Sequence, residues 1–220
     1  GNILLLEWVM SAMPDEVVLY TNPMSRGRIA RWMLEEAGCP YRVQVLAYEQ
    51  MKSADYLAIN PMGKVPAIVH RGTVVTETAA ICTYLADAFP AAGLAPALTD
   101  PQRGSYLRWL FFTAGPVEAA VTARALGQEP PAEKAGFVGY GSYAAVMGVL
   151  EQAVEQASPW LLGERFSAAD VYVGSQILFG LQFKSLEPRP AFVAYAQRLR
   201  ERAAWQRAGA ADDALIAVND

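Results

Sequence analysis

The feature that most constrains the fold is the run Asn60–Val69, in which a tight turn leads through a proline into a short apolar segment. Pro61 and Gly63 predict the turn, because proline fixes φ and glycine tolerates positive φ. Residues 67–69 are apolar and predict a strand. Pro66 stands at the start of that strand, the position that tolerates a missing N–H.

Pro66 allows two interpretations. It can be an ordinary proline of an edge strand. Alternatively, its peptide bond can be cis, an isomer open to proline at low cost and to other residues only at high cost. A cis bond would turn the Val65 backbone outward. Its free N–H and C=O could then pair with an extended peptide, as an added strand does.

A second strand and a helix complete this region. Residues 70–73 predict a turn, and Val74-Val75 predict the strand that follows it. A helix then begins near Thr76 and runs to Ala88. Glu77 and Thr78 put an acid and a hydroxyl at its start. Such a pair is either a cap with a first-turn acid or a binding site for a ligand at the helix N-terminus.

The preceding segment predicts a strand, a helix and a second strand. Residues 17–20 form a short apolar run that indicates a buried strand. Ser25 precedes an amphipathic helix, which Gly38 ends as a C-cap. Residues 41–47 alternate between apolar and polar, which predicts the second strand, and this connection length predicts a right-handed βαβ unit. Residues 48–59 predict a short helix and a loop.

The second half of the chain contains only helical patterns. Residues 89–98 are rich in glycine and proline and predict a linker. The expected helices begin at Asp100-Pro101, with a kink near Gly115-Pro116, at Pro131 (running to about Ala157), at the capping motif Ser167–Asp170 and at Pro190.

Composition excludes several classes of protein. The chain has 220 residues, of which 53% are hydrophobic and 18% charged, which indicates a folded protein of one large or two small domains. The net charge of −4 gives no basic excess for binding nucleic acid. No apolar run is long enough to cross a membrane. The run Ile3–Met10 is short and contains an acid, so it does not predict a signal peptide.

The reactive residue types are few. His70 is the only histidine, and we expect it in a turn, so a site with two histidines is excluded and no metal site is predicted. Cys39 and Cys82 have neither metal-binding nor redox spacing. We expect both to be packed as small apolar residues in a reduced, cytoplasmic setting.

The segments "NPMGKVP" (60–66) and "ETAAI" (77–81), in this order, resemble two motifs of the cytosolic glutathione S-transferases. The resemblance extends from Val17 to about Ala204 and is to bacterial members of the theta-like and zeta-like serine class. It implies a thioredoxin-like α/β N-terminal domain followed by an all-α helical domain. The domains would span residues 15–88 and 99–220, joined by the linker at 89–98.

The resemblance also implies a catalytic hydroxyl. Ser25 is similar in place to the serine that stabilises the thiolate of glutathione, and Arg26 and Arg28 lie beside it. The alternative is that Ser25 only caps its helix. Tyr20 is the rival hydroxyl, because some classes use a tyrosine at the end of this strand.

Six residues resemble the contacts to the rest of glutathione. Glu77 and Thr78 would hold the γ-glutamyl group. A lysine would meet the glycyl carboxylate, although surface lysines are usually only solvated. The full set is Lys52, Lys64, Val65, Pro66, Glu77 and Thr78.

For function, the resemblance implies a dimeric glutathione transferase that needs no metal and no covalently bound cofactor. Glutathione would be the co-substrate, and an apolar electrophile would bind near Trp109 and Phe112, aromatic residues that can equally belong to the core. A glutathione-dependent peroxidase, an isomerase and a non-catalytic binding protein of the same fold remain alternatives. Membranes and nucleic acid are not expected partners.

Overall fold

The computed structural model describes residues 15–217. The expected N-terminal extension, residues 1–13, lies outside this range. The described residues form two compact units. One contains residues 15–92 together with residues 202–217, and the other contains Gly93–Glu201.

The first unit is built on a four-stranded sheet in the order β2-β1-β3-β4. Strand β1 pairs with β2 in parallel and with β3 antiparallel, and β4 pairs antiparallel with β3. This mixed sheet confirms the predicted strands and the thioredoxin-like arrangement. The strands are β1 (Val17–Thr21), β2 (Tyr41–Val45), β3 (Ala67–His70) and β4 (Thr73–Thr76).

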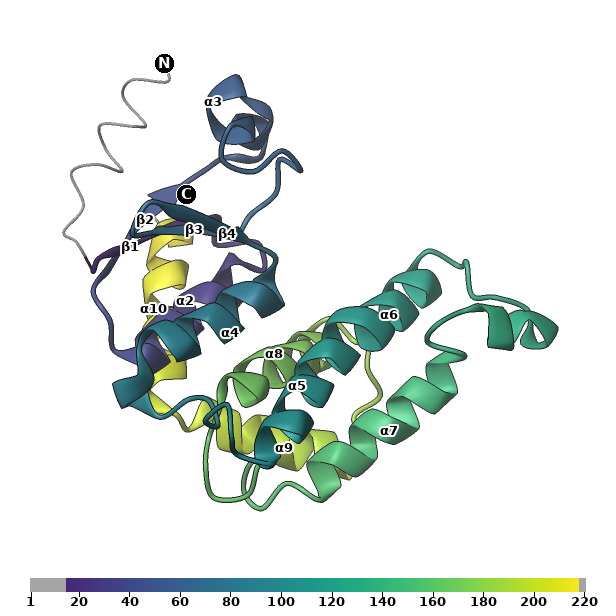
Figure 1. Ribbon diagram of the computed structural model, residues 1–220. Helices are drawn as coiled ribbons and strands as arrows, with labels where there is room; N and C mark the ends of the chain where they lie inside the picture. Colours follow the sequence, from purple (N-terminus) through teal and green to yellow (C-terminus); the bar gives the residue numbers. More distant parts are fainter. Residues whose placement is uncertain (1–14, 218–220) are drawn as a thin grey trace. The chain divides into compact units, whose positions relative to one another are not determined.

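Alternate residues of the sheet face two different layers, because successive side chains of a strand point to opposite faces. Helices α2 (Gly27–Ala37) and α4 (Thr78–Ala88) pack together on one side (Figure 1). On the other side, the short helices η1 (Tyr48–Lys52) and α3 (Ala54–Leu57) contribute to a separate apolar cluster with Val18 and Ala67.

Two details of this unit differ from expectation. His70, predicted in a turn, is the last residue of β3 and is fully buried. The turn itself is made by Arg71 and Gly72, both at positive φ. Helix α4 begins at Thr78 rather than near Thr76, because β4 continues to Thr76 and Glu77 occupies the N-cap position.

The C-terminal helix α10 (Ala203–Ala217) packs against α2 in the first unit (Figure 1). The sequence interpretation assigned this segment to the helical domain and did not predict a separate helix here. The structure differs because four ion pairs join α10 and the residue before it to α2, and their partners are far apart in sequence. The pairs are Arg28–Asp213, Arg31–Asp212, Arg202–Glu36 and Arg207–Glu35.

The second unit is helical throughout its regular elements, which confirms the predicted all-α half. Helix α8 lies at its centre, since most of its residues are buried, and it packs against α5 and α9. The longer helices are α5 (Gln102–Phe112), α6 (Glu118–Ala125), α7 (Tyr143–Glu155), α8 (Ala168–Gln182) and α9 (Pro190–Arg200).

One helix in this unit was predicted wrongly. The helix expected from Pro131 to Ala157 is broken into a 3₁₀ segment, η4 (Ala132–Phe137), and α7, with Gly141 at positive φ between them. Ser142 then caps α7 through the Ala145 N–H.

Around Gly115-Pro116, where a kink was expected, α5 widens into a π-helical turn (η3, Thr113–Val117) that leads into α6. A π-turn accommodates the missing N–H of proline inside a continuous helix.

Candidate functional site

The sheet brings three candidate segments to one end. In the register, Tyr20 of β1 lies opposite Ala67 of β3, and Ala67 lies opposite Thr76 of β4. Because β3 is antiparallel to both neighbours, the end of β1, the start of β3 and the end of β4 meet at the same edge. The turn with Ser25, the Val65 backbone and Glu77 all leave the sheet there.

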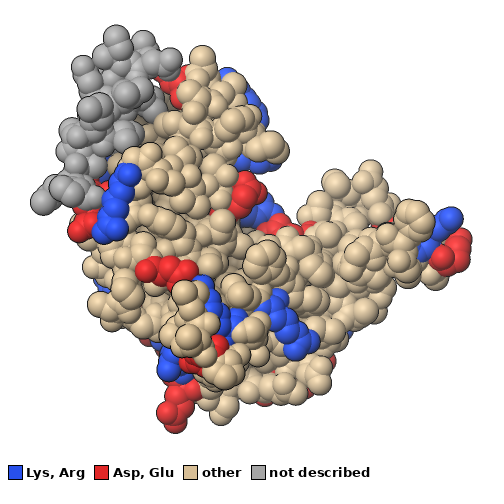
Figure 2. Space-filling view, in the orientation of Figure 1, with Lys and Arg blue, Asp and Glu red and all other residues tan. Residues whose placement is uncertain are grey.

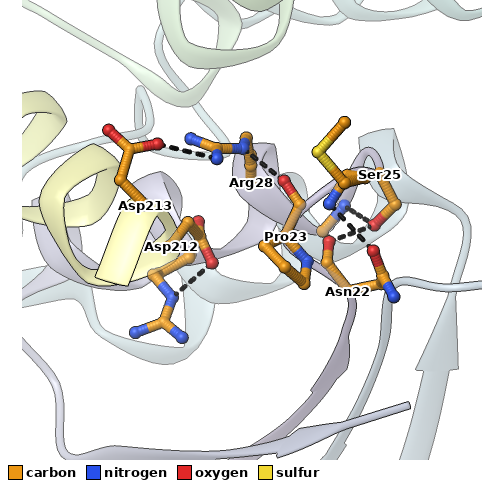
Figure 3. Close-up of polar contacts among 9 residues, drawn as sticks. Asn22, Pro23, Ser25, Arg28, Asp212 and Asp213 are labelled. Carbon is orange, nitrogen blue, oxygen red and sulfur yellow. Dashed lines mark hydrogen bonds and ion pairs between the residues drawn. The ribbon is translucent and has the colours of Figure 1, made fainter. Parts of the chain in front are cut away.

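The Ser25 hydroxyl is held by the turn that joins β1 to α2 (Figure 3). Its Oγ donates to the Asn22 carbonyl at 2.7 Å and accepts the Gly27 N–H at 3.0 Å. Asn22 stabilises the turn further: its Oδ1 accepts the Met24 N–H at 2.8 Å, and its Nδ2 donates to the Leu46 carbonyl at 2.8 Å. Ser25 thus bonds to the first residue of α2, although Arg26 rather than Ser25 is the N-cap residue.

Gly27 lets α2 begin very close to the end of β1. A Cβ on Gly27 would lie 1.8 Å from the Thr21 Oγ1 and 3.0 Å from the Ser25 Oγ. Any side chain at this position would displace the turn. The glycine therefore fixes the distance between the strand end and the Ser25 hydroxyl.

Tyr20 is placed differently from Ser25. It is fully buried, and its ring centre lies 5.6 Å from that of Tyr56 in the cluster on the α3 side of the sheet. Burial raises the pKa of Tyr20 to about 12. A hydroxyl in this position lacks the surface needed to reach a bound ligand.

The turn before β3 exposes a main-chain segment. The Val65–Pro66 peptide bond is cis, and Pro66 is buried while Val65 is half-buried. The Lys64 carbonyl accepts hydrogen bonds from the Tyr56 hydroxyl at 2.6 Å and from the Asn60 Nδ2 at 2.8 Å. Within residues 15–217, the N–H and C=O of Val65 have no hydrogen-bond partner. They are therefore available to a ligand.

The two candidate lysines differ in their contacts. The Lys52 ammonium lies against the same turn, 3.2 Å from the Gly63 carbonyl and 3.4 Å from the Met62 carbonyl. A Cβ on Gly63 would approach the Lys52 Nζ to 2.9 Å. Lys52 thus holds the turn, whereas the Lys64 side chain is exposed.

Glu77 has an unusual backbone at the start of α4. Its φ is 71° and its ψ is 116°, a region that residues with a Cβ rarely occupy. Such a conformation costs about 1–3 kcal/mol and is concentrated at functional sites. The Glu77 side chain is exposed and makes no capping hydrogen bond, and Thr78 beside it is half-buried.

In the second unit, the aromatic residues of α5 divide between core and surface. Tyr106 and Leu110 are buried, while Phe111 is 72% exposed. Trp109 and Phe112 are half-buried, with their ring centres 5.9 Å apart in an edge-to-face pair.

Both thiols are inert by position. Burial raises the pKa of Cys39 to about 11 and that of Cys82 to about 12. A thiol that stays protonated near neutral pH is a poor nucleophile. Neither cysteine belongs to the edge of the sheet described above.

Sequence reasoning missed two residues of this region. Asn22 was used only as a turn marker, although an Asx turn after a strand is a recognisable local signal. Asp213, which binds Arg28, carries no local signal, because its partner is 185 residues away in the sequence.

Within residues 15–217, no group of three or more His, Cys, Asp or Glu side chains could hold a metal ion. No helix between residues 15 and 217 is long and apolar enough to span a membrane. On the face shown in Figure 2, acidic and basic side chains are interspersed among neutral ones.

The chain is similar to known protein families and relatives. Residues 24–88 match the family model described as the glutathione S-transferase N-terminal domain. The chain is 30% identical over 156 residues to glutathione S-transferase GstA of Escherichia coli O157:H7, covering 67% of this chain and 73% of the relative. The chain belongs to the glutathione S-transferase family.

Solved structures and other relatives agree with this assignment. A glutathione transferase from Methylococcus capsulatus has 29% identity and a TM-score of 0.74, with 90% of this chain and 98% of that chain covered. A Sulfitobacter homologue with bound glutathione has 28% identity and a TM-score of 0.69, with coverages of 89% and 97%. Rat maleylacetoacetate isomerase is 26% identical over 193 residues, which are 76% of this chain and 85% of the isomerase.

Proposed function

We propose that this family member is a glutathione transferase that binds glutathione at the edge of the sheet and stabilises its thiolate at Ser25. The observation that carries the proposal is the convergence of three groups there: the Ser25 hydroxyl, the unpaired Val65 backbone and the strained, exposed Glu77. The Sulfitobacter relative with bound glutathione supports the choice of ligand.

Each group has a role that suits its chemistry. Glutathione is an extended peptide, and the Val65 N–H and C=O can pair with its backbone. The Glu77 carboxylate can bind the γ-glutamyl ammonium, and Thr78 with the first N–H groups of α4 can bind the γ-glutamyl carboxylate. We assign the glycyl carboxylate to Lys64, with Lys52 and the buried Pro66 holding the turn in place.

Ser25 would act on the sulfur. Its single hydroxyl hydrogen now bonds to the Asn22 carbonyl, a neutral hydrogen bond with a net contribution of roughly 0.5–1.5 kcal/mol. A bond to a thiolate is charge-assisted and contributes roughly 1.5–3 kcal/mol. The hydroxyl therefore gains by turning to the sulfur, while the Gly27 N–H continues to donate to its Oγ.

The thiolate would then form a bond between its sulfur and an electrophilic carbon. In a substitution, the bond from that carbon to its leaving group breaks, and the group departs as an anion. In an addition, the displaced electron pair takes up a proton from water. We assign the binding of an apolar electrophile to Trp109 and Phe112 of α5, which are partly accessible. Tyr20 is the less suitable hydroxyl because of its burial.

Glutathione-dependent isomerisation is a second candidate. The likeness to rat maleylacetoacetate isomerase favours it, and it would use the same thiolate. A peroxidase reaction would also share the thiolate, while a non-catalytic protein of this fold would bind glutathione and turn over nothing.

A panel of electrophiles, hydroperoxides and cis-alkene diacids, assayed with glutathione beside a calorimetric titration of glutathione, separates these functions. We expect binding and turnover of at least one electrophile. Binding without turnover of any class would favour the non-catalytic alternative, and no binding would contradict the proposal.

We also propose a homodimer located in the cytoplasm. Large apolar side chains are exposed in both units, among them Val74 in β4 and Phe111 in α5, and surfaces of this kind are often covered by a second copy. Light scattering at micromolar concentration should give twice the mass of 23.9 kDa. A monomer would contradict the proposed assembly.

A further inference from the structure

Arg28 connects the Ser25 turn to the C-terminal helix (Figure 3). Its Nε donates to the Pro23 carbonyl at 2.5 Å, and its Nη2 donates to the Asp213 carboxylate at 2.9 Å. Arg28 belongs to the first turn of α2, and Asp213 lies on α10. One planar guanidinium therefore makes both contacts, and its rigid fork couples their positions.

The Pro23 carbonyl lies inside the turn that presents Ser25. The preceding carbonyl, that of Asn22, accepts the Ser25 hydroxyl. Pro23 has no N–H, and its fixed φ makes this part of the turn stiff. A force on the Pro23 carbonyl is therefore transmitted through the turn to Ser25, whose Oγ stays bonded to the Gly27 N–H when the hydroxyl turns to the sulfur.

Asp213 is placed by a helix that is already docked. Its neighbour Asp212 is fully buried and pairs with Arg31 of α2 at 3.1 Å. Arg202, next to the start of α10, makes two hydrogen bonds of 2.8 Å to Glu36 at the other end of α2. These contacts fix α10 along α2, so the Asp213 carboxylate meets Arg28 with little freedom left to lose.

We propose that Asp213 and Arg28 are positioning residues for the Ser25 hydroxyl. Asp213 orients the guanidinium of Arg28, which holds the Pro23 carbonyl and thereby the turn. This inference rests on the proposed function of Ser25. A purely structural role is the competing explanation, but exposed ion pairs contribute little to stability, and the Asp213 side chain is 72% exposed.

Positioning and electrostatics make opposite predictions for the pKa of the bound thiol in the Asp213→Ala variant. The charged groups nearest the turn are Arg26 at the N-cap of α2, Arg28 of α2, and Asp212 and Asp213 of α10, and the Tyr48 hydroxyl of η1 donates to the Met24 carbonyl at 2.8 Å. Removing one negative charge from this set favours a nearby thiolate and lowers the pKa of the bound thiol. Loss of positioning weakens the Ser25 hydrogen bond and raises that pKa.

The experiment follows the thiolate absorbance of bound glutathione against pH in the Asp213→Ala variant. We expect the pKa of the bound thiol to rise by about half a unit. Below that pKa, this corresponds to a roughly threefold fall in kcat with little change in KM for glutathione. Arg207→Gln is the matched control, because it breaks an exposed ion pair between the same two helices, with Glu35, away from the turn. The control should leave the thiol titration unchanged.

The Ser25→Ala variant and the Ser25→Ala/Asp213→Ala double variant complete the test. If Asp213 acts through Ser25, its removal has no further effect on the thiol pKa once the hydroxyl is absent. A lowered or unchanged pKa in Asp213→Ala, with a raised pKa in Ser25→Ala, overturns the positioning role and leaves the proposed function intact. An unchanged pKa in Ser25→Ala overturns both. A shift in the Arg207→Gln control equal to that in Asp213→Ala assigns the effect to helix docking and also overturns the inference.

Discussion

Helices α8 and α2 begin with similar residues that serve different purposes. At α8, Ser167 and Asp170 are both fully buried. The Asp170 carboxylate accepts the Ser167 N–H at 3.0 Å, the Leu161 N–H at 3.0 Å and the Tyr195 hydroxyl at 2.7 Å. At α2, Ser25 is half-buried and has one donor and one acceptor contact.

The difference separates a folding device from the proposed binding site. A buried carboxylate that accepts several protein donors contributes to stability and has no exposed surface for a ligand. A half-buried hydroxyl can exchange one weak neutral contact for a stronger charged one. The start of α4 resembles that of α2 in this respect, since Glu77 is exposed, strained and without a capping bond.

The largest effect is expected for Asp170→Ala. It leaves the N–H groups of Leu161 and Ser167 and the Tyr195 hydroxyl without their acceptor, each at a cost of roughly 1–3 kcal/mol, so the free energy of unfolding should fall by about 3 kcal/mol or more. Chemical denaturation measures this loss. Tyr195→Phe removes only one of these donors and should cost about 1 kcal/mol. Equal losses for the two variants would contradict the shared role of the carboxylate.

Glu77→Ala should affect binding rather than folding. Loss of a charge-assisted contact of roughly 1.5–3 kcal/mol weakens glutathione binding by about 10- to 100-fold. The free energy of unfolding should change by less than about 0.5 kcal/mol, because the side chain is exposed. Calorimetry and denaturation measure the two quantities. Glu133→Ala, at an exposed acid in the first turn of η4, is the control. Unchanged affinity in a folded Glu77→Ala variant would remove Glu77 from the site.

The smallest effect is expected for Ser142→Ala. Ser142 is an exposed cap whose Oγ accepts the Ala145 N–H at 3.1 Å. Loss of such a cap costs about 1 kcal/mol of stability. Glutathione affinity and the titration of its thiol should not change. A change in either would mean that helix caps in general, rather than the Ser25 turn, influence the site.

The sheet and its motifs were predictable because their signals are local. Pro66, Gly63 and the apolar segment after them specify a turn and a strand within ten residues. The break between η4 and α7 was missed because the spacing of apolar residues does not indicate it. Gly141 and Ser142 nevertheless supply a turn and a cap there.

The docking of α10 could not be predicted from local patterns in the sequence. Its residues are rich in alanine, and its position depends on ion pairs with α2, such as Arg31 with the buried Asp212. Long-range pairing of this kind has no local sequence signal. The contact of Asp213 with Arg28 could not be predicted from the sequence for the same reason.

The family's glutathione contacts at Ser25 and Glu77 remain predictions. The sequence supplied the residue types, and the structure adds their common position at one edge of the sheet. The competing interpretation of Ser25 as a cap also has support, since its Oγ does accept the Gly27 N–H.

The most direct measurement is the pH titration of the bound glutathione thiol in the Ser25→Ala variant. The exchange of a neutral for a charge-assisted hydrogen bond predicts a pKa about one unit higher than in the unmodified protein. Turnover near neutral pH should fall about tenfold if thiolate formation limits the rate. Tyr20→Phe should leave the titration unmoved, because Tyr20 is fully buried. A shift in Tyr20→Phe with none in Ser25→Ala would contradict the account.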